Sequence, residues 1–480
     1  MSEKSLKKNA VFTFLKAFFS ICFPLISFPY ASRILRPDGI GKVNFANSII
    51  SIFTLIAGLG LNSYGIREIS KVQNNKILLS KTLKELLLIN FFSTIFSYAL
   101  FILSLIFVPK FNEYSSLLIL CSLNIIFTTL GVDWFYRGLE DFKYITIRSF
   151  IFQIISLIFL FLFVKTKNDI FNYAMIGIIS SVGSNICNII HLRDYFILKT
   201  PKLEIKKHIK PIFIFFGIAV SISIYTLLDT TMIGFFKDDF EVGLYSAANK
   251  INKIVLSLIT AVTAILLPRL SYYYKNEIKK FYFLLNKSVH YILIISIPSA
   301  VGLYIISDDI ILLFSGIEYL EASISMRIMT PIIIFISLSN FLNGQLLVSI
   351  NKEKIGFLTY ILSAIINFTL NFILIPPYGA IGASIGTVIT EGIVATIQFI
   401  YTKKYFNKRK LLKTIFQCLI GIIIFFIISF FINKIIHNLY IRIIFNIFIC
   451  CAIYIIVLLL FKNKQTEEII YIIKNKLKRN

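Results

Sequence analysis

Apolar runs of about twenty residues recur along the chain, and they constrain its fold more than any other feature. A helix rises about 1.5 Å per residue, so about twenty helical residues cross the hydrocarbon core of a bilayer. About fourteen runs reach that length with almost no charge, at residues 9–31, 43–65, 85–108, 115–136, 144–164, 170–190, 211–236, 242–268, 288–307, 326–349, 355–376, 379–401, 411–432 and 441–461. We therefore predict an all-α polytopic membrane protein with about 14 transmembrane helices.

The composition excludes the main alternatives. The chain is 57% hydrophobic and only 15% charged, whereas soluble domains carry about 25% charged residues. So few charged residues cannot cover the surface of a water-soluble globular protein. A chain this hydrophobic also lacks the composition of a disordered protein. The six cysteines lie inside apolar runs and the four histidines show no ligand spacing. We therefore expect no disulfide framework and no metal site.

The basic residues are distributed unequally between alternate connections. If the N-terminus is cytoplasmic, about 36 of the 49 Lys and Arg fall in cytoplasmic segments and about 10 in external ones. This bias predicts the orientation, and an even number of spans puts both termini in the cytoplasm. The first run is longer than the core of a signal peptide and lacks a cleavage site, so we predict a retained helix. The tail at 465–480 is either an amphipathic surface helix or a solvated charged end.

A weak internal repeat predicts the domain organisation. The segment GKVNFANSI, which begins at Gly41, aligns with GLYSAANKI, which begins at Gly243. Each copy follows a long span and a short external turn, which indicates a parallel repeat. We predict an N-lobe at 1–205 (spans 1–6) and a C-lobe at 206–405 (spans 7–12), related by an axis along the membrane normal. A further helix pair and the tail occupy 406–480.

Charged residues inside the spans are the candidate binding residues, because a charge at membrane depth is costly. Lys250 and Lys253 lie deep in the eighth span on one helix face, and they suit an anion in a water-filled cavity. Their alternatives are snorkelling or an ion pair. Arg33 is either a ligand or an interface anchor, and Lys16 either a ligand or a snorkelling side chain. Asn47 and Asn249, aligned by the repeat, complete the candidate cavity set.

Two acids at membrane depth are candidates for ion coupling. Asp229 lies in the seventh span and Glu391 near the middle of the twelfth. A carboxylate there is protonated, paired or ion-bound, so each suits coupling to an H⁺ or Na⁺ gradient. Their alternative role is to pair with Lys250, Lys253 or a backbone group. For Asp133 and Trp134, at the end of the fourth span, an aromatic belt at the membrane interface is favoured.

No connection between spans exceeds about twenty residues, so there is no room for an extramembrane catalytic domain. The sequence Gly39-Ile40-Gly41-Lys42 has neither the spacing nor the Ser/Thr of a phosphate-binding loop. We therefore expect no enzyme, no catalytic residue and no cofactor. Since most of the net charge of +25 fixes topology, it does not indicate a nucleic-acid partner.

Five stretches, in order, resemble the Wzx-type oligosaccharide flippases of the multidrug/oligosaccharidyl-lipid/polysaccharide exporter superfamily. They are PLISFPYASRILRPDGIGKVNFANSI with GLGLNSYGIREISK (24–71), DWFYRGLEDFKYITIRS (133–149), LLDTTMIGFFKDDFEVGLYSAANKI (227–251), LLPRLS (266–271), and NGQLLVSINKEK through PPYGAIGASIGTVITEG (343–392). The resemblance spans about 9–405, and the last two helices are only consistent with it.

The resemblance implies a flippase of the bacterial cytoplasmic (inner) membrane. It would move an undecaprenyl-pyrophosphate-linked oligosaccharide to the external leaflet by alternating access, for O-antigen or capsule-like polysaccharide. Polymerase and glycosyltransferase partners would accompany it. The implied cationic cavity would contain Arg33, Lys250 and Lys253. The alternatives are a cation-coupled drug exporter of the same superfamily, which favours an acidic and aromatic cavity, and a polysaccharide polymerase, which needs a large extramembrane loop.

Overall fold

The computed structural model describes residues 3–197, 201–264, 266–463 and 465–468, and over these residues the chain is helical with no β-strand. This confirms the predicted all-α class. Contacts divide the chain into two compact units, unit 1 (Met1–Gly243) and unit 2 (Leu244–Asn480). The predicted lobe boundaries at 205 and 405 stay predictions. Most of the predicted amphipathic tail lies outside the described residues, which include only 465–468 of it.

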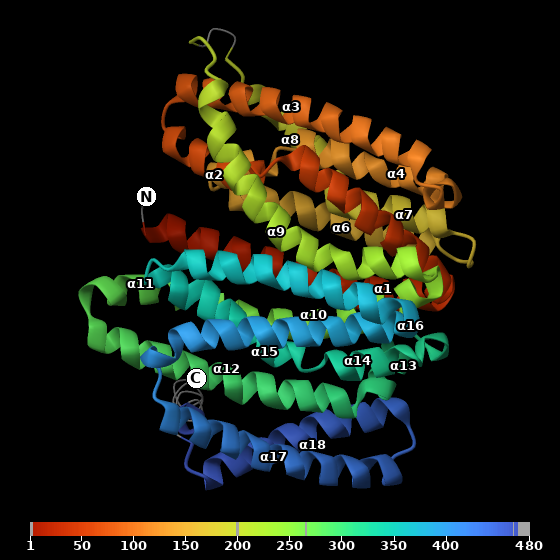
Figure 1. The fold of residues 1–480 in the computed structure, drawn as a ribbon, viewed down its shortest axis with the longest axis vertical. Helices are drawn as coiled ribbons and strands as arrows, with labels where there is room; N and C mark the ends of the chain where they lie inside the picture. Colours follow the sequence, from red (N-terminus) through yellow and green to blue (C-terminus); the bar gives the residue numbers. More distant parts are fainter. Residues whose placement is uncertain (1–2, 198–200, 265, 464, 469–480) are drawn as a thin grey trace. The chain divides into compact units, whose positions relative to one another are not determined.

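Unit 1 is built from long helices joined by short turns, and α3 and α4 run side by side within it (Figure 1). Side-chain caps start two of its helices: Asn75 accepts from the backbone N–H of Ile77 and Leu78, and Asp141 accepts from that of Tyr144. A π-helical turn, Ile179–Gly183, joins α7 to α8, and a 3₁₀ turn, Leu192–Tyr195, follows α8. The helices are α1 (Glu3–Gly58), α2 (Leu61–Val72), α3 (Lys76–Phe107), α4 (Lys110–Leu130), α5 (Asp133–Gly138), α6 (Phe142–Phe163), α7 (Ile170–Ile178), α8 (Asn185–His191) and α9 (Lys206–Phe236).

Unit 2 has the same helical character, and its last two helices pack as a hairpin (Figure 1). Helix α10 begins in unit 1 and continues into unit 2. A π-helical turn, Leu342–Leu347, extends α15, and 3₁₀ turns lie at Ile317–Tyr319 and Lys403–Tyr405. The helices are α10 (Asp239–Ala264), α11 (Leu266–Asn276), α12 (Ile278–Ile305), α13 (Ser307–Phe314), α14 (Ala322–Met329), α15 (Ile332–Phe341), α16 (Glu353–Thr402), α17 (Lys408–Ile435) and α18 (Leu439–Leu460).

Ten helical segments of the described chain are long and apolar enough to cross a membrane. The number rises to 11 if the bent pair Lys206–Ser221 and Thr226–Phe236 is counted as one span. Two of the ten, Phe18–Val72 and Glu353–Tyr405, are 55 and 53 residues long. Each is more than twice the length that one crossing needs. The chain is therefore a multi-pass membrane protein, and the count of 14 crossings stays a prediction.

Both overlong segments contain a backbone break. In α1 the break is at Arg36, with φ 62°, and the next residue is Pro37, whose ring disfavours the helical conformation at the residue before it. In α16 it is at Gly379, with φ 55°, shortly after Pro376 and Pro377. Glycine adopts this left-handed conformation without steric cost. Proline and glycine thus interrupt the longest helices near the middle.

An aromatic and aliphatic core holds α2, α3, α5, α6 and α9 together in unit 1. Its fully buried members include Leu61, Phe135 and Tyr136. By contrast, α3 exposes a series of large apolar side chains beyond this core, among them Phe92 and Phe107. Exposed apolar side chains on a membrane helix suit contact with lipid.

Candidate functional site

The two predicted deep lysines lie on one side of α10. The other side of this helix is packed: Ala248 and Asn252 are fully buried, and the Asn252 amide donates to the carbonyls of Ala248 and Met326. At about 100° per residue, Lys250 and Lys253 are about 60° apart and opposite that packed side. Lys253 is exposed, whereas Lys250 and the candidate Asn249 are half-buried. Each lysine also takes part in an interaction within the chain, and the role of the pair as anion ligands stays a prediction.

The predicted candidates on α1 lie on either side of its break. Arg33 is exposed, one turn before Arg36, and Asn47 is half-buried in the second half of the helix. The Asn47 carbonyl accepts a hydrogen bond of 2.7 Å from the Ser51 hydroxyl. Both belong to unit 1, whereas the lysines of α10 belong to unit 2. Their grouping around one ligand stays a prediction.

Lys16 lies near a cluster of charges. Asp133, the first residue of α5, accepts hydrogen bonds from Arg137 (2.7 Å) and from the buried Arg148. Arg148 also donates to Ser184 (3.1 Å), which ties α6 to the turn before α8. Lys16 is close enough to Asp133 to attract its carboxylate. The function of Lys16 as a ligand stays a prediction.

The two predicted coupling acids are both buried. Asp229 on α9 is 6% exposed and has a polar or electrostatic partner. Glu391 on α16 is 4% exposed, and no described residue forms a hydrogen bond or ion pair with it. A carboxylate in that position must be protonated or bind an ion, because an isolated buried charge is strongly disfavoured. Ion coupling by Asp229 and Glu391 stays a prediction.

A polar cavity of about 290 Å³ lies within unit 1, and the sequence patterns did not predict it. It is bounded by the ends of α1 and α4, the start of α2 and residues of α3, α5 and α9. No charged residue is among its lining residues, and hydroxyl and amide side chains dominate the lining. The hydroxyl and amide residues are Ser51, Thr54, Asn62, Ser63, Asn90, Thr128, Thr129, Ser223 and Thr226. Hydroxyls both donate and accept hydrogen bonds, so such a cavity suits a neutral ligand rich in hydroxyl groups.

Trp134, the single tryptophan of the chain, also lines this cavity. It is 3% exposed, so the predicted aromatic belt at the membrane interface is wrong for this residue. Its ring packs on Gly65, where a Cβ would meet the indole carbons at 2.5 Å. Among the described residues its indole N–H has no hydrogen-bond partner. A buried donor without a protein partner is costly.

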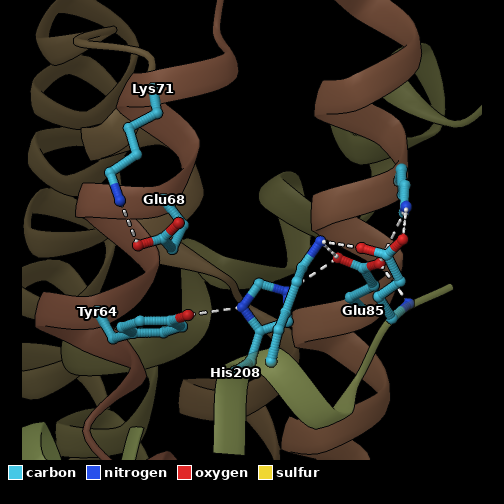
Figure 2. A network of polar contacts seen from close by, with 8 residues as sticks. Tyr64, Glu68, Lys71, Glu85 and His208 are labelled. Carbon is cyan, nitrogen blue, oxygen red and sulfur yellow. Dashed lines mark hydrogen bonds and ion pairs between the residues drawn. The ribbon is translucent and has the colours of Figure 1, made fainter. Parts of the chain in front are cut away.

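A second polar network, also missed from sequence, is centred on His208 of α9 (Figure 2). The Tyr64 hydroxyl lies 2.6 Å from His208 Nδ1, and Glu85 lies 2.8 Å from Nε2 on the other side. An ionised carboxylate only accepts, so Nε2 donates to Glu85. With His208 neutral, Nδ1 accepts from Tyr64. The three buried residues come from α2, α3 and α9 and join these helices.

Glu85 is the most heavily bonded member of this network. Its side chain is 0% exposed, and Lys207 lies 3.2 Å and Lys81 3.9 Å from its oxygens. The backbone N–H of Glu204 donates to it at 2.7 Å. Lys207 and Lys81 also pair with the exposed Glu204 carboxylate and hold its pKa below the ordinary value. The network therefore fixes the start of α9 to α3, a structural task.

No group of three or more His, Cys, Asp or Glu in the described part of the chain could hold a metal ion. The α10 lysines, the buried Glu391 and the hydroxyl-lined cavity are a cationic, an acidic and a neutral polar feature of the described chain.

Comparisons with known proteins agree with the resemblance found in the sequence. The family model described as polysaccharide biosynthesis protein matches residues 6–274, more than half of the chain, and the MatE model matches residues 215–373. A "Putative O-antigen transporter" of Shigella dysenteriae is 26% identical over 398 residues, which are 81% of this chain and 98% of that protein.

Two solved structures share the fold. A structure of "Lipid II flippase MurJ, inward closed conformation" aligns with a TM-score of 0.76 and 20% identity, over 95% of this chain and 99% of the other. An inward-facing multidrug resistance MATE family transporter of the MOP superfamily aligns with a TM-score of 0.62 and 14% identity, over 80% and 93%. At these identities the likeness shows the fold alone.

Proposed function

Because the chain belongs to the polysaccharide biosynthesis protein family, we propose that it is a flippase for a lipid-linked oligosaccharide. It carries an undecaprenyl-pyrophosphate type substrate from the cytoplasmic to the external leaflet by alternating access, for O-antigen or capsule-like polysaccharide. The observation that carries this proposal is the neutral, hydroxyl-lined cavity of unit 1. Sugar hydroxyls can exchange hydrogen bonds with such a lining, whereas the prenyl chain stays in lipid.

The relatives are named as transporters and flippases, which move a substrate without changing its covalent structure. We therefore assign no catalytic residue and no cofactor to the chain. A polysaccharide polymerase would not fit these relatives. The location is the bacterial inner membrane, with both termini in the cytoplasm, where polymerase and glycosyltransferase partners would act on the same substrate.

The topology that we propose has 14 crossings in two six-helix lobes plus a helix pair. Dividing each overlong segment at Arg36 and at Gly379 raises the ten candidates to 12, and the bent pair in α9 raises them to 13. Helix α10, which corresponds to the eighth predicted span, would be the fourteenth crossing. A reciprocal contact supports the repeat: Gly41 packs directly on the carbonyl of Asp239, and Gly243 packs directly on the carbonyl of Pro37. Asp239 lies four residues before Gly243, and Pro37 lies four residues before Gly41. The two contacts are therefore equivalent, as expected for two elements related by a two-fold axis.

We assign the pyrophosphate to Lys250, Lys253 and Arg33, because Lys and Arg bind phosphate oxygens through charge-assisted hydrogen bonds. Asn47, Asn249 and Lys16 are the further cavity residues of this proposal. The position of both lysines opposite the packed side of α10, with Lys253 exposed and Lys250 half-buried, supports the assignment. Alternating access would then expose the same ligand set to each side of the membrane in turn.

A cation-coupled exporter of the same superfamily is the second candidate function. The MatE match over residues 215–373 favours it, and so does the buried carboxylate of Glu391. Both functions can use an H⁺ or Na⁺ gradient, so Glu391 and Asp229 are the coupling residues under either proposal. The uncharged cavity of unit 1 favours an oligosaccharide over an organic cation, since a cationic drug would be attracted by acids there.

The decisive experiment replaces Lys250→Gln together with Lys253→Gln and measures export of surface polysaccharide. A matched control removes two exposed lysines of the same unit, Lys275→Gln with Lys279→Gln. We expect export to be lost in the first variant and retained in the second, with both proteins present in the membrane. Normal export by the first variant would refute the assigned site. Drug efflux that depends on the chain, without polysaccharide export, would favour the second function.

A further inference from the structure

A second polar pocket, of about 530 Å³, lies in unit 2 where α12, α17 and the end of α18 meet. It is distinct from the α10 lysines and from Glu391, because none of them lines it. The proposed translocation does not use it. It also involves the last two helices, to which the flippase function assigns no task.

The pocket is strongly cationic. Four lysines line it, Lys287, Lys410, Lys413 and Lys462, against one acid, Glu468. Lys287 already pairs with Glu468 at 2.5 Å, and this pairing holds the pKa of the Glu468 carboxyl below its ordinary value. Three lysines therefore remain whose charge no acid in the lining offsets. The connection that supplies two of them, residues 402–413, is itself basic and free of acids.

The wall of the pocket is fixed by buried polar side chains. His290 and Thr414 are each 4% exposed, and the Thr414 hydroxyl lies 2.8 Å from His290 Nδ1. With Nδ1 engaged, Nε2 is the ring nitrogen that is left for another partner, and no described residue bonds to it. Gln417, 3% exposed, accepts from the Asn463 amide at 2.6 Å and donates to the Phe461 carbonyl at 3.0 Å. These contacts preorganise the pocket before any ligand arrives.

The first turn of α17 forms the rim. The Asn407 side chain caps this helix by accepting from the backbone N–H of Lys410, and the Asn407 N–H donates to Asn286 of α12 at 3.1 Å. The N-terminus of a 28-residue helix carries partial positive charge and adds to the attraction of the lysines for an anion.

Apolar side chains flank the same pocket. Phe283 lines it and is 65% exposed, and Phe416, on the neighbouring face of α17, is 62% exposed. A soluble anion would gain no contact with these apolar side chains, whereas an acyl chain can pack against them. Basic pockets between membrane helices on the cytoplasmic side are typical binding sites for anionic lipid headgroups.

We propose that this pocket binds the phosphate headgroup of an anionic phospholipid of the cytoplasmic leaflet, with its acyl chains along α12 and α17. The choice of leaflet rests on the proposed topology, whereas the existence of the pocket does not depend on that topology. The lipid would contact α12 and the last helix pair at the same time, and its phosphate would occupy the cationic pocket between them.

The test uses the purified full-length chain in detergent, titrated with phosphatidylglycerol and followed by native mass spectrometry. The variant is Lys410→Gln with Lys413→Gln, and the matched control is Lys408→Gln with Arg409→Gln. All four side chains are exposed on the same helix, but only the first two line the pocket. Because no transport is measured, failure of the flippase proposal would leave this result unaffected.

We expect the pocket variant to bind phosphatidylglycerol roughly 30-fold more weakly, since each lysine beside an anionic headgroup contributes roughly fivefold. The control should lose less than about threefold, as expected for a diffuse surface charge. Equal losses in the two variants would overturn the proposal. So would equal binding of phosphatidylcholine, which has no net charge. Binding of glycerol phosphate or inorganic phosphate as tight as that of the lipid would identify a soluble anion as the ligand instead.

Discussion

Glu85 and Glu391 are both buried glutamates on long membrane helices, one in each unit, and their surroundings differ completely. Glu85 accepts from His208 and from the backbone of Glu204, with Lys81 and Lys207 nearby. Glu391 has no hydrogen-bond or ion-pair partner among the described residues. A paired buried charge holds a structure together, whereas an unpaired carboxyl can take up and release an ion. Burial alone therefore does not identify a coupling residue. The hydrogen-bond and ion-pair partners of the carboxyl group distinguish a structural role from ion coupling.

The strongest test of this contrast removes the paired carboxylate. Glu85→Ala should lower the free energy of unfolding by about 3–5 kcal/mol, because it leaves buried cationic and polar partners uncompensated. Denaturant titration of the purified chain in detergent measures this. The exposed Glu113→Ala on α4 should change stability by less than about 0.5 kcal/mol. If Glu85→Ala were as mild as that control, the network would not be structural.

The second test removes the unpaired carboxyl. Glu391→Gln should change stability by less than about 1 kcal/mol, because no partner loses a bond. Transport, however, should fall by roughly tenfold or more and lose its dependence on the ion gradient. Substrate flipping in reconstituted vesicles, with and without an imposed H⁺ or Na⁺ gradient, measures this. The control is Glu353→Gln, an exposed acid on the same helix. Gradient-dependent transport by the Glu391 variant would exclude this residue as the coupling site.

A milder change probes the other side of the network. Tyr64→Phe removes the hydroxyl that lies 2.6 Å from His208 and should cost about 1 kcal/mol. The same denaturant titration applies, with Tyr401→Phe as an exposed control. No effect of Tyr64→Phe would mean that His208 is held by Glu85 alone.

The smallest effect concerns Glu204, whose side chain is 61% exposed. Hydrogen bonds from Lys207 and Lys81 hold its pKa below the ordinary value, so its contribution is present at neutral pH and is lost as pH falls through the folded pKa. Glu204→Gln should lower the thermal midpoint slightly at pH 7, and the difference from the parent chain should vanish near pH 3. A difference that persists at low pH would contradict this assignment.

Apolar runs were sufficient to predict a helical, multi-pass membrane protein, because membrane-spanning helices need no long-range information. The same holds for the position of Lys250 and Lys253 on one side of α10, which follows from helical periodicity. Glu85 and His208 are 123 residues apart, so local patterns cannot show their pairing. The hydroxyl-lined cavity was equally invisible, since serine and threonine in membrane helices ordinarily bond to their own backbone. Trp134 looked like an interface residue because sequence gives depth along a helix but not the direction in which a side chain points.

The reciprocal contact of Gly41 and Gly243 limits how this chain can vary. Each glycine meets a backbone carbonyl, and every residue type at the opposite position carries the same carbonyl. A bulkier residue at Gly41 therefore cannot be rescued by a smaller side chain at Asp239, as a core clash could be. Genetic suppressors of such a substitution should instead map to positions that shift a whole helix, such as the neighbouring Pro37.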